Sequence, residues 1–228
     1  VHGGYWVSGD KDYYGLATGL YGTIGLALAK RGVGAVVTSY RLAPGVGIDG
    51  ILLDVMRALK WTQDNIKSYG GDKSRIFLMG HSAGGHLIAL IGAKDKLHTQ
   101  QGMKPRSVAG YIALSAVWDV ADMHTRNTAD FNKSVTYKTF GTDPKRYGGY
   151  SPVTHLHKKM SPFLVLIGEN DFGYMIPQAQ RAYTALKGLS AKHRLSSIKG
   201  NTHMDMVLRF GASNDNLTAP IAKFVLGK

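Results

Sequence analysis

One serine has the sequence setting of a nucleophile. Gly80-His81-Ser82-Ala83-Gly84 follows a strand-like run at residues 75–79 and precedes an apolar, helix-like run at residues 85–91. The two glycines allow a tight strand-to-helix turn, because no Cβ atom stands in the way. Such a turn exposes the serine hydroxyl above the sheet. We therefore predict that Ser82 is a nucleophile for acyl transfer.

The opening residues supply a second part of such a site. In His2-Gly3-Gly4-Tyr5-Trp6, the small residues allow backbone N–H groups to approach a developing oxyanion. We predict that the amides of Gly4 and Ala83 donate to this oxyanion, with Gly3 adjacent. The alternative interpretation is an ordinary glycine turn.

An acid is expected after a buried strand. Residues 162–168 form a continuous apolar run that ends in Glu169-Asn170-Asp171. Parallel sheets place their chemistry at the carboxyl ends of the strands. We predict that Asp171 orients the base. Glu169, the only glutamate of the chain, is the alternative, and Asp119 is a more distant one.

The base follows from chain order. The order in this type of site is serine, then acid, then histidine, and only His193 and His203 lie after Asp171. His193 precedes a strand-like segment at residues 194–198, at the edge remote from Ser82. We therefore predict His203 as the general base.

Composition excludes several other kinds of chemistry. The 228 residues, 44% hydrophobic and 19% charged, favour one globular domain over residues 1–228. The absence of cysteine excludes disulfides and thiolate catalysis and is compatible with oxidising and reducing compartments alike. The net charge of +13 is scattered without a basic, aromatic stripe, so no nucleic-acid partner is expected. No run approaches the roughly 20 apolar residues of a membrane span.

No metal or organic cofactor is expected either. His155 and His157 have strand spacing for a shared face, but no third ligand follows at a suitable distance.

The remaining sequence predicts alternating strands and helices. This pattern indicates an α/β fold with a mostly parallel sheet and helices on both faces. Strands are expected at residues 34–39, 75–79, 107–118, 163–168 and 194–198, and helices at 54–68, 82–93, 176–189 and within 219–226.

A polar segment at residues 119–151 interrupts this alternation. We interpret it as a long loop that acts as a small lid or specificity insert, the alternative being a surface excursion. Five apolar side chains near the predicted chemistry are candidates for a substrate pocket, although ordinary packing would also explain each of them: Tyr5, Trp6, Trp118, Tyr174 and Met204.

Together these motifs resemble the α/β-hydrolase superfamily, and more narrowly the hormone-sensitive-lipase-like esterases with their kynurenine formamidase neighbours. The resemblance covers nearly the whole chain. It implies that the oxyanion loop is His2-Gly3-Gly4-Tyr5-Trp6 and that Tyr40-Arg41-Leu42-Ala43-Pro44 is a structural turn. The nucleophile is then expected in Gly80-His81-Ser82-Ala83-Gly84-Gly85. The acid is expected in Gly168-Glu169-Asn170-Asp171 and the base in Asn201-Thr202-His203.

The chain departs from this pattern twice. Several strands usually precede the oxyanion loop, so we expect that earlier strands are missing from this sequence. Tyr5 replaces a glycine that many esterases have, as in the formamidase-like branch. The resemblance implies a serine hydrolase acting on a small-molecule carboxylic ester through an acyl-enzyme. The alternatives are an aryl formamidase or amidase with the same residues, and a non-catalytic binding protein on this scaffold.

Overall fold

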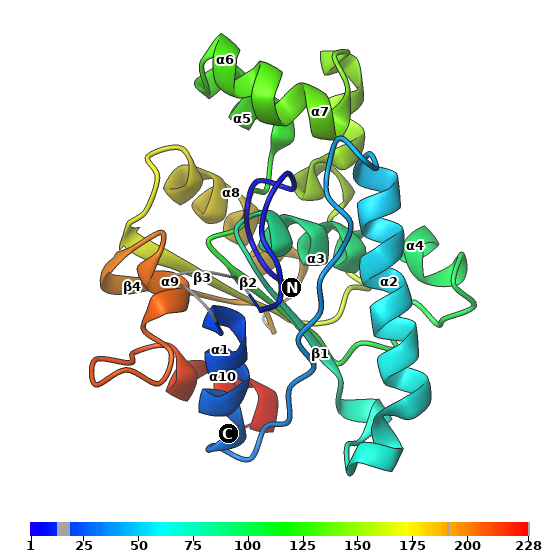
Figure 1. Cartoon of the computed structure of the whole chain (residues 1–228), viewed down its shortest axis with the longest axis vertical. Helices are drawn as coiled ribbons and strands as arrows, with labels where there is room; N and C mark the ends of the chain where they lie inside the picture. The colour runs from blue at the N-terminus through cyan, green and yellow to red at the C-terminus, as the bar shows by residue number, and fades with distance from the viewer. Residues whose placement is uncertain (13–18, 191, 228) are drawn as a thin grey trace.

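A four-stranded parallel sheet in the order β1-β2-β3-β4 positions the candidate residues in the computed structural model, which describes residues 1–12, 19–190 and 192–227 (Figure 1). The strands are β1 (Phe77–His81), β2 (Gly110–Leu114), β3 (Phe163–Asn170) and β4 (Arg194–Thr202). Met79 pairs with Ile112, and Ile112 with Leu164. Because all four strands run the same way, their carboxyl ends meet at one edge of the sheet.

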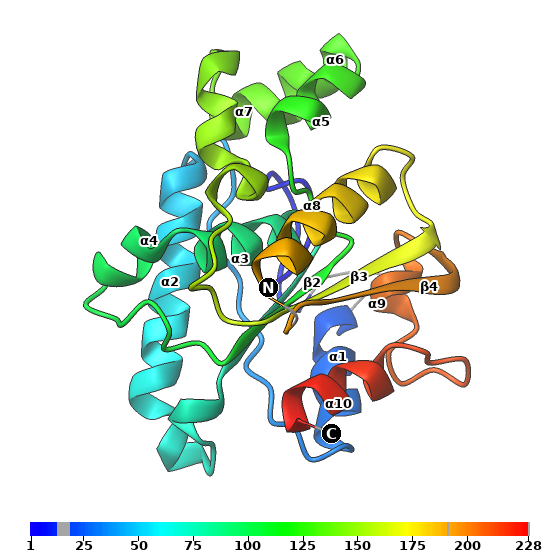
Figure 2. The ribbon, with the colours of Figure 1, turned by 180° about the vertical axis from the view of Figure 1, so that it is seen from behind.

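Helices cover both faces of this sheet. Seen from either side, α3 and α8 lie on one face and α1 and α10 on the other (Figures 1 and 2). The helices are α1 (Leu20–Ala29), α2 (Ile48–Asn65), α3 (Ala83–Ala93), α4 (Asp95–Thr99), α5 (Val120–Arg126), α6 (Ala129–Phe131), α7 (Tyr137–Phe140), α8 (Met175–Leu189), α9 (Asp205–Leu208) and α10 (Thr218–Leu226).

Side chains alternate between two apolar clusters along the buried strands. In β2, Tyr111 and Ala113 pack with α2, α3 and α8, whereas Ile112 and Leu114 pack with α1, α9 and α10. All five residues of β2 are buried. Burial on both faces is what makes such strands continuously apolar in sequence.

Most predicted elements are present, with shifted ends. The helix predicted at 54–68 begins earlier, at Ile48, and the strand predicted at 107–118 is shorter, since only Gly110–Leu114 pair with neighbours. The last strand is longer than predicted and reaches Thr202.

The strand predicted at residues 34–39 is wrong. These residues form no strand, and none of them is buried. A strand needs a hydrogen-bonded neighbour. Among the described residues, Val1 and not residues 34–39 makes backbone hydrogen bonds to the outer edge of β1. The Val1 nitrogen donates to the Met79 carbonyl at 2.8 Å, and the His81 N–H donates to the Val1 carbonyl at 3.2 Å.

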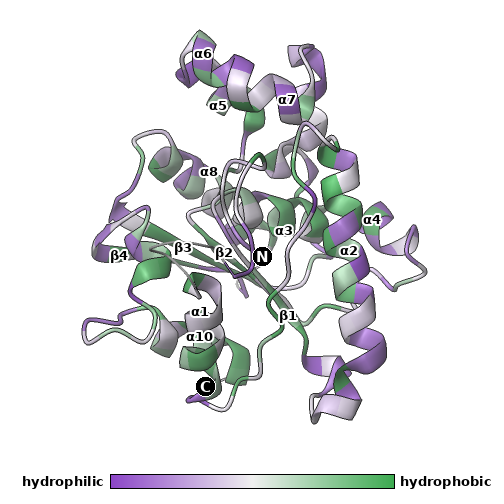
Figure 3. Cartoon of the chain, in the orientation of Figure 1, coloured by the Kyte–Doolittle hydropathy of each residue, from purple (hydrophilic) through white to green (hydrophobic). Residues whose placement is uncertain are grey.

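The segment at residues 119–151 is helical and not the loop that its polar sequence indicates. Asp119 caps α5 by accepting from the Asp122 N–H at 3.0 Å, and Thr128 caps α6 by accepting from the Phe131 N–H at 3.2 Å. These helices stand at the end of the molecule beyond the carboxyl end of β2 (Figure 1). In Figure 3 many residues of these helices are hydrophilic, whereas the central strands and α3 are mostly hydrophobic.

Candidate active site

Ser82 lies at a strained turn between β1 and α3. Its φ of 54° and ψ of −118° are unusual for a residue with a side chain. The surrounding glycines are required by close packing: a Cβ at Gly80 would lie 2.3 Å from the Gly84 carbonyl oxygen, and one at Gly84 would lie 2.4 Å from the His2 carbonyl oxygen. The local sequence therefore forces the geometry of a nucleophile elbow.

Asp171 and His203 form a buried pair. Asp171 lies one residue beyond β3 and His203 one residue beyond β4, at the same edge of the sheet. His203 Nδ1 lies 2.8 Å from Asp171 Oδ1. An ionised carboxylate only accepts hydrogen bonds, so Nδ1 carries the proton, and Nε2 of a neutral ring is left as an acceptor. This is the tautomer that a general base requires.

Several donors keep Asp171 ionised although its side chain is 0% exposed. Burial by itself raises the pKa of Asp171, but hydrogen bonds from His203, Ser115 and the Phe172 N–H outweigh it, so that the pKa lies below its usual value. The Phe172 N–H donates to Oδ1 at 2.7 Å, and the Ser115 hydroxyl donates to Oδ2.

His81, the residue before Ser82, contacts His203. Its Nε2–H donates to the backbone carbonyl of His203 at 3.1 Å, and the two rings lie 4.6 Å apart. Burial lowers the pKa of His81 to about 3, so this ring is neutral near pH 7. Among the described residues, Ser82 Oγ makes no hydrogen bond to the His203 ring. In free enzymes such bonds are often long.

The glycine loop at the start of the chain packs directly on Ser82. A Cβ at Gly3 would lie 3.1 Å from the Ser82 Cβ. The φ of Gly4 is 117°, a region that favours glycine, and its carbonyl accepts from the Ser8 N–H at 2.9 Å. The Gly3 N–H donates to the Tyr21 hydroxyl at 2.8 Å and is not available as an oxyanion donor. Ala83 is the first residue of α3, where N–H groups have no partner within the helix.

The turn at residues 40–44 packs against the glycine loop at the start of the chain. The Ala43 N–H donates to the Trp6 carbonyl at 2.9 Å, and the Tyr40 ring stacks on His2 at 4.1 Å. Arg41 forms a two-pronged ion pair with Asp54 of α2, at 2.8 and 2.9 Å. The turn thereby fixes the glycine loop to the helix layer.

The alternative acids and base lie elsewhere. Glu169 accepts from the Gly200 N–H at 2.9 Å and has no contact with His203. Asp119 caps α5. His193 Nδ1 accepts from the N–H of Phe163, the first residue of β3, at 3.1 Å, which places it at the opposite end of that strand from Asp171.

The five predicted pocket residues fall into two groups. Trp6 and Trp118 are 1% and 0% exposed and pack in the core, so neither lines an open pocket. Tyr5 and Tyr174 are half-buried, and Met204 is exposed beside His203. Tyr5 meets Phe131 of α6 edge-on at 5.5 Å, which brings the segment at residues 119–151 next to the glycine loop.

Sequence reasoning missed three residues of this site, namely His81, Ser115 and Phe172. The Phe172 ring stacks on the His203 ring at 4.4 Å and is 40% exposed. His81 lies within the nucleophile motif itself. For Ser115 the signal was its place directly after the apolar strand that separates the Ser82 strand from the Asp171 strand.

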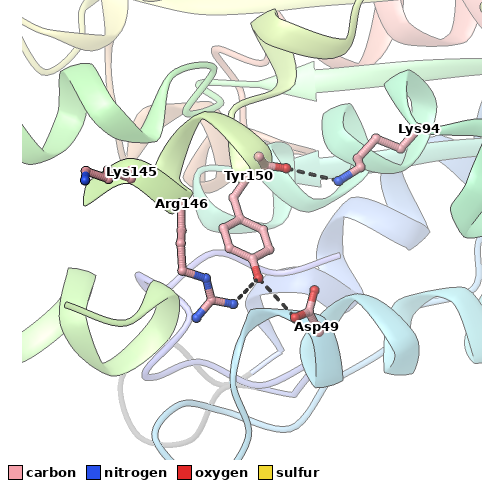
Figure 4. Close-up of a pocket in the computed structure, with 6 residues that line it drawn as sticks. Asp49, Lys94, Lys145, Arg146 and Tyr150 are labelled. Atoms are coloured by element: carbon pink, nitrogen blue, oxygen red, sulfur yellow. Dashed lines mark hydrogen bonds between the residues drawn. The ribbon is translucent and has the colours of Figure 1, made fainter. Parts of the chain in front are cut away.

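A pocket of about 350 Å³ beside Tyr150 contains none of these residues (Figure 4). The Tyr150 hydroxyl donates to Asp49 at 3.0 Å and accepts from Arg146 at 3.2 Å, and Lys94 donates to the Gly149 carbonyl at 3.0 Å. The bond between Tyr150 and Asp49 ties the end of the helical segment at residues 119–151 to α2.

The histidines considered as metal ligands have other partners. His155 donates to the Gly149 carbonyl at 3.0 Å, and His157 lies 3.6 Å from Asp95. Among the described residues, no helix has the length and apolar composition for crossing a membrane.

A parallel sheet flanked by helices, with a serine on a strand-to-helix elbow and an acid–histidine pair at the same sheet edge, defines an α/β hydrolase. The chain belongs to the BD-FAE family, whose model matches residues 1–187.

Relatives with curated names include esterases. The chain is 30% identical over 198 residues to Esterase LipC of Mycobacterium tuberculosis, covering 83% of this chain and 48% of LipC. It is 24% identical over 223 residues to isoprenylcysteine alpha-carbonyl methylesterase ICME of Arabidopsis thaliana, covering 92% and 50%. The chain spans about half the length of these relatives.

Solved structures show the same fold. A truncated form of a carbohydrate esterase from gut microbiota has a TM-score of 0.80 at 19% identity, covering 99% of this chain and 83% of the other. An esterase of Pyrobaculum calidifontis has a TM-score of 0.78 at 21% identity, covering 99% and 74%.

Proposed function

We propose that this chain hydrolyses carboxylic esters of small molecules through an acyl-enzyme on Ser82. The observation that carries the proposal is the 2.8 Å hydrogen bond between buried Asp171 and His203, with His81 tying the base to the strained nucleophile elbow. The esterase names of several relatives support the same reaction class.

In the first step, His203 Nε2 accepts the hydroxyl proton of Ser82 while Oγ attacks the ester carbonyl. Asp171 holds the ring through Nδ1 and stabilises the imidazolium that forms. The protonated ring then gives its proton to the alcohol as the C–O bond breaks. Water repeats the sequence on the acyl-enzyme and releases the carboxylic acid.

The amides of Gly4 and Ala83 are the proposed donors to the tetrahedral oxyanion. Removing one such donor typically costs about 3 kcal/mol of transition-state stabilisation. Gly3 supports them from the side, because its own N–H is already bonded to Tyr21.

The segment at residues 119–151 is the proposed lid or specificity insert. The contact of its Phe131 with Tyr5 supports this assignment. Tyr5, Tyr174 and Met204 are the proposed contacts to the acyl or alcohol group, and Phe172 joins them because its exposed ring covers one side of His203.

The test is hydrolysis of p-nitrophenyl acetate, butyrate and octanoate, beside an aryl formamide, by the wild type and by Ser82→Ala. We expect turnover of at least one ester and a loss of about 10³-fold or more in Ser82→Ala. Ser68→Ala is the matched control, since this exposed serine bonds only to the Asn65 carbonyl.

Turnover of the formamide alone would indicate that the same residues catalyse amide hydrolysis and not ester hydrolysis. Tight binding of esters without Ser82-dependent turnover would overturn catalysis and favour a binding protein.

A further inference from the structure

Ser115 is a completely buried serine in a strained conformation beside the acid. It follows the last residue of β2 and has a φ of 45°, in the left-handed region that favours glycine. A non-glycine residue there is strained and is retained where the surroundings over-determine its conformation.

The backbone around Ser115 joins the two neighbouring strands. The Ser82 N–H donates to the carbonyl of Leu114 at 2.9 Å, and the Ser115 N–H donates to the carbonyl of Leu166 at 2.8 Å. The end of β2 is therefore fixed between the nucleophile elbow on one side and the strand that carries Asp171 on the other.

The side chain of Ser115 completes the surroundings of the carboxylate. Asp171 Oδ1 accepts from His203 Nδ1 and from the Phe172 N–H, whereas Oδ2 accepts from the Ser115 hydroxyl. Among the described residues no other donor reaches Oδ2. With the Asp171 side chain 0% exposed, loss of this hydroxyl would leave a buried, charged oxygen unpaired.

We propose that Ser115 is a positioning residue of the acid, whose hydroxyl fixes the plane of the Asp171 carboxylate so that Oδ1 faces His203. The proposal rests on the proposed function of the Ser82, Asp171 and His203 site. Ser115 touches neither substrate nor the reacting atoms and acts through Asp171.

Within the described part of the chain, the titratable groups that interact with Asp171 are His203, His81, Tyr5 and Tyr174. Burial keeps His81 neutral and raises the pKa of both tyrosines above their usual value. The Ser115 hydroxyl stabilises the ionised carboxylate, so its removal raises the proton affinity of the Asp171–His203 pair.

The test compares Ser115→Ala and Ser115→Gly with the wild type. Both variants lose the hydroxyl, but glycine relieves the positive φ and is expected to fold at least as well as the alanine variant. In both, kcat on an ester should fall about 10-fold to 100-fold with KM changed less than about 3-fold. The acid limb of the pH profile of kcat/KM should move up by about one pH unit.

A purely structural role gives a different pattern, in which Ser115→Gly regains wild-type kcat and both variants keep the wild-type acid limb. That result would overturn the proposal.

A second measurement separates this outcome from failure of the proposed function. The downfield NMR resonance of the His203 Nδ1 proton, assigned by its absence in His203→Gln, should titrate at a higher pH in both Ser115 variants. If the wild type has no Ser82-dependent turnover, the function fails but this titration still decides the role of Ser115, and an unchanged titration overturns it.

Discussion

His81 and His203 are joined twice, by a hydrogen bond of 3.1 Å from the His81 ring to the His203 carbonyl and by ring contact at 4.6 Å. The loop that carries His203 is thus fixed to the turn that carries Ser82. Since misplacement of about 1 Å can cost 100-fold in rate at a catalytic site, we expect this tether to support the proposed activity without reacting itself.

His81→Leu removes this tether and should lower kcat/KM about 10-fold while the protein remains folded. His98→Leu is the matched control, because His98 is also buried and bonds to a carbonyl, that of Ile91 at 3.2 Å, but has no contact with the site. Ester hydrolysis and thermal unfolding of both variants check the prediction. Equal kcat/KM in the two would contradict it.

Acid should destabilise the fold through its buried histidines. Burial lowers the pKa of His81 to about 3 and of His86 to about 4, against about 6.5 when unfolded. Below pH 6.5 the unfolded chain therefore binds protons that the folded chain does not, so stability falls as the pH decreases toward 4. Between pH 6.5 and pH 4, each ring lowers the free energy of unfolding by on the order of 3 kcal/mol.

Urea unfolding midpoints from pH 7.5 to 4 measure this dependence, and His86→Gln should reduce its slope. A midpoint that is the same at pH 7 and pH 5 would show that these histidines already carry a proton when folded.

Two glycine substitutions should differ sharply in stability. Gly84→Ala places a Cβ 2.4 Å from the His2 carbonyl oxygen and should lower Tm by about 8 °C or more. Gly188→Ala lies in α8 with no heavy atom within 4 Å of the new Cβ and should keep or raise Tm, because alanine favours helix. Calorimetry of the two variants is sufficient, and a tolerated Gly84→Ala would count against the tight elbow.

The ion pair between Arg41 and Asp54 should matter more than an ordinary surface pair. Asp54 accepts two guanidinium bonds and the Arg41 backbone N–H at 3.0 Å, whereas the pair of Lys60 and Asp64 is a helical one between exposed side chains. Asp54→Ala should lower Tm by about 2–4 °C and Asp64→Ala by less than about 1 °C. Similar shifts in the two thermal melts would refute a special role for the turn at residues 40–44.

The contact of Phe131 with Tyr5 should affect substrate choice. Phe131→Ala opens the edge of the glycine loop and should change the ratio of kcat/KM between octanoate and acetate esters about 5-fold, since removing apolar contact area costs about 1 kcal/mol. The acetate kcat should change less than 2-fold. An unchanged ratio of kcat/KM between the two esters would indicate that residues 119–151 pack against the glycine loop without affecting substrate choice.

Much of the geometry of the candidate site was predictable, because the glycine motif determines the turn at Ser82 and the order of strands along the chain determines which residues reach the same sheet edge. Gly80 and Gly84 force the elbow, and an acid and a histidine after the next strands reach the same sheet edge. The strand predicted at residues 34–39 failed because an apolar, β-branched run becomes a strand only beside a pairing neighbour. Helix α1 was not predicted, because an apolar run with glycines at 22 and 25 has no clear helical period.

The supporting residues were not predictable for a different reason. The sequence shows only that Ser115 directly follows an apolar strand, whereas its positive φ and its bond to Asp171 arise from the packing of three strands. Trp6 and Trp118 were assigned to a pocket by their position near the site, whereas their size made them the largest buried side chains of the core.

The tether between His81 and His203 spans 122 positions of the chain, and the bonds of Asp171 to Ser115 and His203 span 56 and 32. When the chain is synthesised from its N-terminus, the elbow can therefore form well before Asp171 and His203 exist. Reaction of Ser82 with an active-site-directed phosphonate would then report completion of the whole fold, and would be a more stringent probe of refolding than helical content.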